Sequence, residues 1–315
     1  MSERRLVKWG LPLLMLGILL ILLVLLVFYP AQVRRRPDLL EMSVIAREAD
    51  GSAWATARQG MEQAAADLNV ELRFLYPGQS NSTQEQELLL RREVDSGASA
   101  ILLFPADRED LADEVRSASA RAALVTLETD MEDAAGYVGV DNTALGEALG
   151  RAVLNGVPRG GTVLLVLSAS QRSGVGDRLT AAAEVLRSEG REIRYFSGTA
   201  DAMAEELSRE DIQAVVAFEA SSLERAAEAA GRMEDPPLLY GAGSTAAITA
   251  GLEQGRITSI LAQNAFSAGY LAVQSAARLS RRETAELPAL LPFFTVRREN
   301  MYEPEYQKLL FPVTW

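Results

Sequence analysis

The sequence contains neither cysteine nor histidine among its 315 residues. Without cysteine the chain has no disulfide framework and no thiolate nucleophile. Without histidine it has no Ser-His-Asp triad, and zinc sites built from Cys and His are excluded as well. Carboxylate-bound calcium or magnesium remains compatible with this composition. The chemistry open to the chain is narrow, and we assign it no catalytic residue, no metal site and no cofactor.

Basic residues are concentrated at the N-terminus and are outnumbered elsewhere. Residues 1–37 hold six basic side chains and one acid, a net charge of +5, whereas the whole chain has a formal net charge of −12. The remaining 278 residues therefore carry −17. Phosphate backbones repel a body this acidic, so nucleic acid is not expected as a partner.

One long apolar run stands near the N-terminus. The stretch Trp9–Tyr29 contains no charged residue, and a helix of that length spans about 31 Å, close to the ~30 Å hydrocarbon core of a bilayer. A cleaved signal peptide has a shorter apolar region and small residues at its cleavage site. A lipoprotein anchor needs a cysteine. We predict a retained single-span membrane anchor with a basic linker in residues 1–37, and a long but cleaved signal peptide is the alternative.

Two consecutive sets of strands and helices follow this segment. In the first set, strands are expected at 42–46, 70–76, 100–104, 123–127 and 137–140, and helices at 54–68, 83–95 and 110–120. In the second set, strands are expected at 162–167, 192–196, 214–218, 238–241, 257–263 and 291–296, and helices at 177–188, 202–207, 223–233, 246–254 and 267–279. Largely apolar strands separated by amphipathic helices predict parallel sheets covered on both faces. The expected fold class is α/β with two Rossmann-like lobes, and the tail at 302–315 has no assigned role.

Polar residues follow many of these expected strands. In open parallel sheets, ligands bind outside the carboxyl ends of the strands. This rule selects the following candidates: Glu48, Asp50, Glu128, Asp141, Asn142, 168–171, Glu219, Gly243, Ser244 and Gln263. Ordinary loops also contain polar residues, and Asp141 and Asn142 are good N-cap residues for the helix that follows them. Both interpretations stay open at this point.

Four segments resemble the type I periplasmic binding proteins, the ribose- and galactose-binding group that also supplies the effector domain of LacI-type repressors. They are SGASAILLFPAD (Ser96–Asp107), ALVTLET (Ala123–Thr129), YVGVDNTALGEALG (Tyr137–Gly150) and AGLEQGRITSILAQNAFSAGYLAVQSAARL (Ala250–Leu279). The resemblance implies two lobes joined by a hinge that the chain crosses three times. The N-terminal lobe is then 38–140 plus 264–289, and the C-terminal lobe with its tail is 141–263 plus 290–315. A repressor begins with a helix-turn-helix, whereas this chain begins with an apolar run.

The same resemblance implies a ligand site in the cleft between the lobes. It assigns Asp141 and Asn264 to the hinge, and Asn142 and Gln263 to both hinge and cleft. Trp54 falls where the family has an aromatic ring that stacks on a sugar, although a tryptophan at a helix start is also an ordinary core residue. Arg178 falls near a family arginine that donates two hydrogen bonds. The expected ligand-binding residues are Glu48, Asp50, Trp54, Glu128, Asn142, Arg178, Glu219 and Gln263.

The sequence departs from the family pattern after three strands. Glu128-Thr129 stands where the family usually has Asp and often Arg, Glu219-Ala220 where it has Asn-Asp, and Gly243-Ser244 where it has an Asp. Several partners of sugar hydroxyls are thereby lost, and several carboxylates face one expected arginine. Because unpaired buried carboxylates are costly, the ligand is expected to be a small polar molecule that is either sugar-like or cationic.

The resemblance implies an extracytoplasmic solute-binding protein that hands its ligand to an ABC permease. The same module also suits the sensing input of a membrane sensor kinase, and a degenerate family member would serve only as a docking surface. The residues themselves argue against an enzyme on paired Rossmann-like lobes. No G-x-G-x-x-G follows the first strand, and AREADGSAW lacks the glycines of a dinucleotide-binding turn.

Overall fold

The computed structural model describes residues 18–20, 39–167, 169–208 and 211–311. Of the expected anchor Trp9–Tyr29, only 18–20 belong to this set, and they are helical; the remainder lies outside the described residues. Within the described ranges, no helix combines the length and the apolarity needed to cross a membrane. The chain divides into the units Met1–Leu39 and Leu40–Trp315, and the fold described below is that of the second unit.

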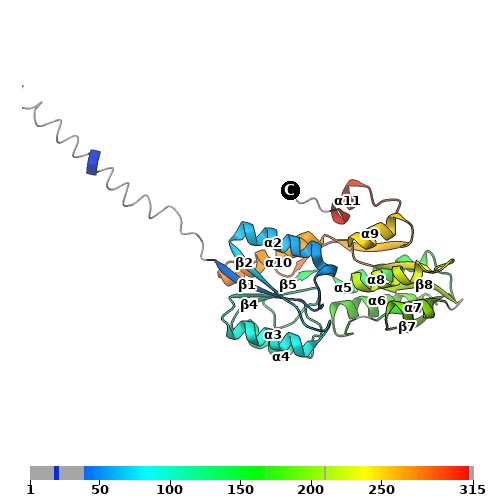
Figure 1. Ribbon diagram of the computed structural model, residues 1–315, viewed down its shortest axis with the longest axis horizontal. Coiled ribbons are helices and arrows are strands. Elements are labelled where there is room, and N and C mark those ends of the chain that lie inside the picture. Colours follow the sequence, from blue (N-terminus) through cyan, green and yellow to red (C-terminus); the bar gives the residue numbers. More distant parts are fainter. Residues whose placement is uncertain (1–17, 21–38, 168, 209–210, 312–315) are drawn as a thin grey trace, which may run out of the picture. The chain divides into compact units, whose positions relative to one another are not determined.

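Among the described residues of this unit, two six-stranded sheets form the framework (Figure 1). The first sheet has the order β11-β5-β4-β3-β1-β2, and all its neighbouring strands are parallel. Its strands are β1 (Leu40–Ile45), β2 (Val70–Leu75), β3 (Ala100–Leu103), β4 (Ala123–Leu127), β5 (Gly136–Gly139) and β11 (Ala289–Leu290). Its covering helices are α2 (Ala55–Leu68) and α10 (Ala265–Ser280) on one face, and α3 (Thr83–Asp95) and α4 (Ala112–Ser119) on the other.

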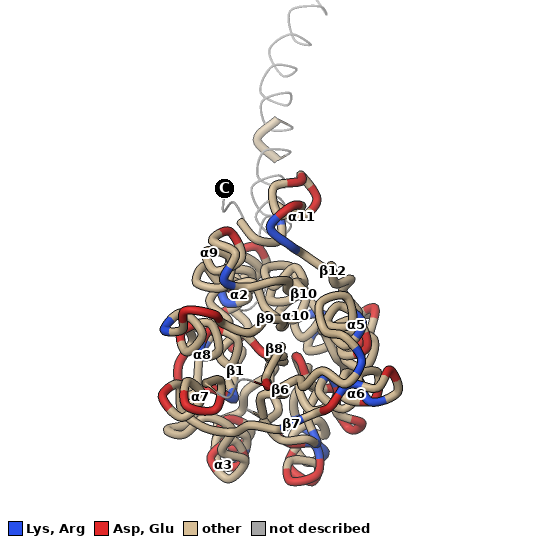
Figure 2. The backbone as a smooth tube through the Cα atoms, turned by 90° about the vertical axis from the view of Figure 1, so that its right-hand side faces the viewer, with Lys and Arg blue, Asp and Glu red and all other residues tan. Residues whose placement is uncertain are grey.

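The second sheet has the order β12-β10-β9-β8-β6-β7. Its strands are β6 (Thr162–Val166), β7 (Glu192–Phe196), β8 (Ile212–Ala217), β9 (Leu238–Ala242), β10 (Ser259–Gln263) and β12 (Phe293–Val296). All are parallel to their neighbours except β12, which runs antiparallel to β10. Figure 2 shows one face under α7 (Ala200–Leu207), α8 (Ala220–Ala230) and α9 (Ala246–Glu253), and the other under α5 (Asn142–Leu154) and α6 (Gly174–Ser188).

The strands that carry no polar alternation have a neighbouring strand on both sides within their sheet. Every residue of β3 and of β6 is buried, and the side chains of each strand reach the cores on both faces of its sheet. This pattern is typical of parallel strands that helices cover from both sides. The expected α/β class with two mainly parallel sheets is therefore confirmed.

Within the described residues, the chain passes from one sheet to the other at three places: after β5, after β10 and between β11 and β12. Two of these passages begin with a helix cap. Asp141 accepts a hydrogen bond from the backbone N–H of Ala144 (2.9 Å) at the start of α5. Asn264 accepts one from Ser267 (2.8 Å) at the start of α10. The N-cap interpretation of Asp141 is confirmed.

Several expected boundaries were wrong. The expected strand 291–296 is shorter, since β12 begins at Phe293, and the short β11 before it belongs to the other sheet. Helix α6 begins at Gly174 because the Ser173 side chain caps it by accepting from Gly176 N–H (3.2 Å). A 3₁₀ turn, η1 (Ser52–Trp54), precedes α2, and the tail without an assigned role contains α11 (Pro304–Leu310).

Candidate ligand-binding site

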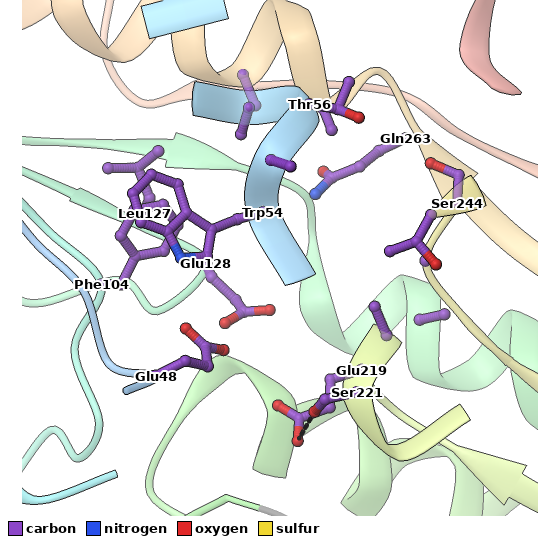
Figure 3. A pocket seen from close by; sticks show the side chains of 18 of the residues that line it. Glu48, Trp54, Thr56, Phe104, Leu127, Glu128, Glu219, Ser221, Ser244 and Gln263 are labelled. Carbon is purple, nitrogen blue, oxygen red and sulfur yellow. Dashed lines mark hydrogen bonds between the residues drawn. The ribbon is translucent and has the colours of Figure 1, made fainter. Parts of the chain in front are cut away.

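A pocket of about 430 Å³ lies where the carboxyl ends of the two sheets' strands meet (Figure 3). Both sheets contribute to its lining, as expected for ligands at the carboxyl ends of parallel strands. The expected site residues that line it are Glu48, Trp54, Glu128, Arg178, Glu219 and Gln263. Asp50 and Asn142 are not among the lining residues. The strand-end positions that the sequence singles out thus supply several of the polar residues that line the pocket.

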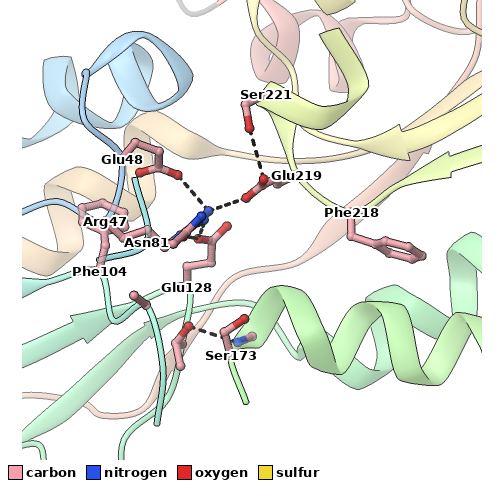
Figure 4. A network of polar contacts seen from close by, with 12 residues as sticks. Arg47, Glu48, Asn81, Phe104, Glu128, Ser173, Phe218, Glu219 and Ser221 are labelled. Atoms are coloured by element: carbon pink, nitrogen blue, oxygen red, sulfur yellow. Dashed lines mark hydrogen bonds and ion pairs between the residues drawn. The ribbon is translucent and has the colours of Figure 1, made fainter. Parts of the chain in front are cut away.

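A buried arginine that the sequence analysis missed lies at the centre of this site. Arg47 follows β1, is only 2% exposed, and extends one guanidinium nitrogen, Nη2, to three carboxylates (Figure 4). Nη2 lies 2.8 Å from Glu48, 2.8 Å from Glu128 and 2.7 Å from Glu219. Its Nη1 donates to Asn81 (2.9 Å) and its Nε to Glu128 (3.0 Å). The expectation of one arginine among several carboxylates is thus wrong, because the site contains two.

The second arginine, Arg178 on α6, is 4% exposed and contacts residues that follow strands of both sheets. Its Nε donates to the side-chain oxygen of Asn142 (2.7 Å), and its Nη1 donates to the Phe218 carbonyl (2.9 Å) and lies 3.4 Å from Glu128. Asn142 also donates to the backbone carbonyl of Glu128 (2.7 Å). Asn142 therefore lies behind the pocket and orients Arg178.

Glu128 connects these groups through an unusual backbone conformation. It has φ of 62°, in the left-handed region that non-glycine residues seldom occupy. Its side chain contacts both arginines, while its carbonyl accepts the Asn142 amide. The same carbonyl would lie 2.0 Å from a Cβ added at Gly174. Only a glycine at the start of α6 permits this close approach between α6 and the residue that follows β4.

Burial and crowding of like charges shift the ionisation of the cluster. Burial raises the pKa of Glu48 to about 7, opposed in part by Arg47 and reinforced by Glu128 and Glu219. Burial alone would lower the pKa of Arg47, but the surrounding carboxylates outweigh it and raise that pKa well above its ordinary value. Arg47 therefore stays charged, and the charge of Glu48 changes near neutral pH.

An aromatic cluster forms one wall of the pocket. The Trp54 ring is 7% exposed and lies 5.4 Å from Phe104, 5.7 Å from Phe74 and 5.9 Å from Tyr76, measured between ring centroids. Its indole nitrogen is buried and has no hydrogen-bond partner in the described part of the chain. Trp54 is thus both a core residue and a pocket residue, which joins the two interpretations of the sequence.

The opposite wall comes from the second sheet. Gln263, the last residue of β10, lines the pocket, and its side-chain oxygen is buried with no donor among the described residues. Ser221 donates to Glu219 (3.1 Å), and Thr245 donates to Glu224, a fourth pocket carboxylate. Neither Glu224 nor Thr245 was selected from the sequence, since Glu224 lies within α8 and Thr245 caps the start of α9, three residues after β9.

Asp50 has a different position from the other acids. It is exposed, and its carboxylate accepts hydrogen bonds from the Ser52 backbone N–H (2.8 Å) and hydroxyl (2.6 Å). These bonds lower the pKa of Asp50. The residue therefore closes the turn before η1 instead of lining the pocket.

A family model described as "periplasmic binding protein domain" matches residues 43–284. The chain belongs to the periplasmic binding protein family. The family is one of binding proteins, and the pocket at the carboxyl ends of the strands agrees with this membership. No curated protein matches the sequence of this chain.

Solved structures of this family share the fold at low sequence identity. A carbohydrate-transporter solute-binding protein from Agrobacterium radiobacter, in complex with D-arabinose, has a TM-score of 0.79 at 18% identity and covers 87% of this chain and 99% of its own. A carbohydrate transporter from Acidothermus cellulolyticus, in complex with myo-inositol, has a TM-score of 0.73 at 21% identity over 86% and 98% of the two chains. A XylFII–LytSN complex gives a TM-score of 0.75 at 19% identity over 84% and 99%. Identities this low establish the shared fold alone.

Proposed function

We propose that this protein is a membrane-anchored, extracytoplasmic solute-binding protein that captures a small, sugar-like ligand in the pocket between its two sheets. The observation that carries the proposal is the pocket itself, which combines a buried ionic cluster, an aromatic wall and a strand-end glutamine. Ligand pockets characteristically combine apolar walls with a few convergent polar groups. The sugars named for the structural neighbours support a ligand of similar size and chemistry.

The ligand-binding residues in this proposal are Glu48, Trp54, Glu128, Arg178, Glu219 and Gln263, together with Arg47. Two lobes, 38–140 plus 264–289 and 141–263 plus 290–315, would close on the ligand about a hinge containing Asp141 and Asn264. Closure of this kind stabilises whichever arrangement binds the ligand more tightly. The three passages of the chain between the sheets support this division.

The proposal also includes a membrane anchor at residues 9–29 and a protein partner. The uncharged run Trp9–Tyr29 supports the anchor. The proposed partner is an ABC permease that receives the ligand. The alternative partner is a membrane receptor for which the protein is the sensing input. One structural neighbour was solved in complex with a second protein, LytSN, which supports action through a protein partner. Co-purification of a permease or of a receptor kinase distinguishes the two.

Binding is tested by thermal unfolding of the full-length protein in detergent against a panel of neutral pentoses, hexoses and inositols. A ligand at a hundred times its Kd adds about 2.7 kcal/mol to the free energy of unfolding. At about 2–4 °C per kcal/mol, this raises Tm by several degrees. We expect at least one panel member to do so.

The matched variants are Gln263→Ala and Gln254→Ala. Gln263 lines the pocket, whereas Gln254 is exposed at the end of α9. Gln263→Ala is expected to weaken the Tm shift because the ligand loses the unpaired side-chain oxygen, and Gln254→Ala is expected to leave it unchanged. A shift that survives Gln263→Ala in full would place binding elsewhere on the molecule.

A further inference from the structure

The pocket contains more negative than positive charge. Its lining includes the guanidinium groups of Arg47 and Arg178 and four carboxylates, those of Glu48, Glu128, Glu219 and Glu224. When all are ionised, these six side chains have a net charge of −2. Because charges out of water are costly unless they are paired, this imbalance favours a ligand that carries positive charge.

Of the six guanidinium nitrogens of Arg47 and Arg178, five contact protein acceptors among the described residues. All three guanidinium nitrogens of Arg47 contact acceptors on the protein, at 2.7–3.0 Å. Two nitrogens of Arg178 bond to Asn142 and to the Phe218 carbonyl. An anionic ligand would have to displace these contacts to reach the five nitrogens, so the arginines mainly balance the pocket's own carboxylates.

What the pocket offers a ligand is mainly hydrogen-bond acceptors. Glu128 and Glu219 each have further side-chain partners beside Arg47, whereas Arg47 is the one side-chain donor to Glu48 among the described residues. Glu48 is also 17% exposed in its side chain and lines the pocket. The buried side-chain oxygen of Gln263 adds an acceptor that no described residue satisfies. A ligand with several hydrogen-bond donors satisfies these acceptor oxygens.

One buried donor constrains the ligand in the opposite sense. The indole N–H of Trp54 has no acceptor in the described part of the chain although the residue is 93% buried. In Figure 3 its nitrogen lies on the ring edge turned toward Glu48 and Glu128. An unsatisfied buried donor costs about 1–3 kcal/mol. A ligand oxygen near Glu48 satisfies it, so the ligand needs an acceptor as well as donors.

We propose that the ligand is a hydroxylated primary amine of the amino-sugar class, with its ammonium group against Glu48 and a hydroxyl oxygen accepting the indole N–H of Trp54. This inference rests on the proposed function and narrows its ligand class. The ammonium supplies donors and a positive charge to the acceptor-rich end of the pocket. The remaining atoms of the ligand lie along an apolar wall that includes Leu127, Val138 and Leu261.

The test compares matched ligands on the full-length protein by calorimetric titration at pH 7. D-glucosamine, D-galactosamine and D-mannosamine are each compared with the parent hexose and with the N-acetylated form, which keeps the ring but has no charge. We expect at least one amino sugar to bind ten-fold or more tightly than its parent, and N-acetylation to remove that preference. The acetylated ligands make the test independent of any variant's folding.

Two variants then assign the preference to a residue. Glu48→Gln removes one pocket charge, and Asp50→Asn removes one charge two residues away, outside the pocket lining. We expect Glu48→Gln to reduce the amino-sugar preference at least ten-fold and Asp50→Asn to leave it unchanged. A preference unchanged by Glu48→Gln would overturn the proposal. Binding of parent hexoses as tight as that of amino sugars would overturn it and leave the proposed function intact, whereas silence from all the sugars would count against both.

Discussion

At the scale of single residues, Glu48 is the group that makes the site sensitive to pH. It shares Arg47 with two other carboxylates, and burial raises its pKa from 4.5 to about 7. A carboxyl with a raised pKa binds its proton more tightly in the folded chain than in the unfolded one. Between these two values folding therefore takes up a proton, and a rise in pH opposes it.

We predict how the pH dependence of the free energy of unfolding differs between Glu48→Gln and the unaltered protein. Both side chains are neutral at pH 5, whereas at pH 8 only the glutamate is charged. A ten-fold change in the protonation equilibrium is worth about 1.4 kcal/mol, so the shift from 4.5 to about 7 corresponds to about 3.5 kcal/mol over the full titration. Because the carboxyl in the unfolded chain is already mostly ionised at pH 5, we expect the glutamine variant to gain roughly 2–3 kcal/mol of this over the unaltered protein between pH 5 and pH 8, measured by urea unfolding.

Asp50→Asn is the reference for this comparison, because bonds to Ser52 lower the pKa of Asp50 instead of raising it. A lowered pKa stabilises the fold above the unfolded value and loses that effect as pH falls. The Asp50 variant should therefore show no gain between pH 5 and pH 8. Equal pH profiles for Glu48→Gln and the unaltered protein would mean that the pocket leaves Glu48 ionised throughout.

The residues of the pocket could be predicted from the sequence only in part. The strand-end rule selects Glu48, Glu128, Glu219 and Gln263 because a buried apolar strand and its end are visible in the sequence. Arg47 occupies the same kind of position, two residues after the end of β1, and the same rule applied to every polar residue would have found it. Its role depends on a glutamate 172 residues away, and no local pattern encodes that contact.

At the scale of elements, α2 and α10 form a closely packed helix pair. A Cβ on Gly269 would lie 1.9 Å from the Ala57 carbonyl oxygen, and one on Gly60 would lie 1.9 Å from the Phe266 carbonyl oxygen. The two glycines therefore let the helix backbones approach each other directly. The alanines at 272, 276 and 277 of α10 are buried along the same helix. This packing holds the start of α2, and with it Trp54, against the first sheet.

Gly269→Ala is predicted to destabilise the protein. The added methyl group has no space, so the helices must separate, and overpacking of this kind costs about 1–3 kcal/mol. The expected result is a Tm lower by several degrees in thermal unfolding, although alanine has the higher helix propensity. Gly231→Ala is the control, because Gly231 is exposed, has φ of −64° and ends α8. A Tm unaffected by Gly269→Ala would show that α10 can shift freely on α2.

Elements with strong local signals could be predicted closely. The bounds of α3, β4 and β7 agree with the expectation. The Ser82 cap marks the start of α3, a largely apolar run defines β4, and an alternating run defines β7. The sequence predicts the start of α6 three residues too late, because Gly174 and Gly176 are typical of a loop. In the structure both glycines pack closely against neighbouring backbone. Helix α11 is short, and its leucines are buried only by tertiary contacts that the sequence does not display.

At the scale of the whole unit Leu40–Trp315, ion pairs connect the half built on the first sheet to the half built on the second. Arg47 extends from the first half to Glu219 of the second (2.7 Å), and Arg178 extends back to Glu128 (3.4 Å). A second group lies outside the pocket lining. Arg172 contacts three acids of the first half at Asp107, Glu109 and Asp110. These contacts favour the arrangement in which the halves touch.

Arg172→Ala is predicted to shift the protein toward a more open arrangement. Exposed ion pairs contribute little individually, and Arg172 is 47% exposed in its side chain, so its three pairs together bias the arrangement only modestly. If only the closed arrangement binds the ligand, a smaller closed population raises the ligand Kd, and we expect a rise of a few-fold. Because the chain has no cysteine, cysteines introduced at Leu88 and Glu205 give unique spin-label sites, one on each half. We expect a longer label distance in the variant.

Arg116→Ala is the matched control, since Arg116 pairs with Asp113 and Asp133 within the first half alone. It removes a comparable number of exposed ion pairs without touching the boundary between the halves. Its label distance and ligand Kd should equal those of the unaltered protein, whereas added salt should reproduce the Arg172 effect by screening the same charges. An unchanged distance in Arg172→Ala would mean that the other contacts across the boundary, among them Arg47–Glu219, Arg178–Glu128 and Arg108–Asp177, hold the halves together without help from Arg172.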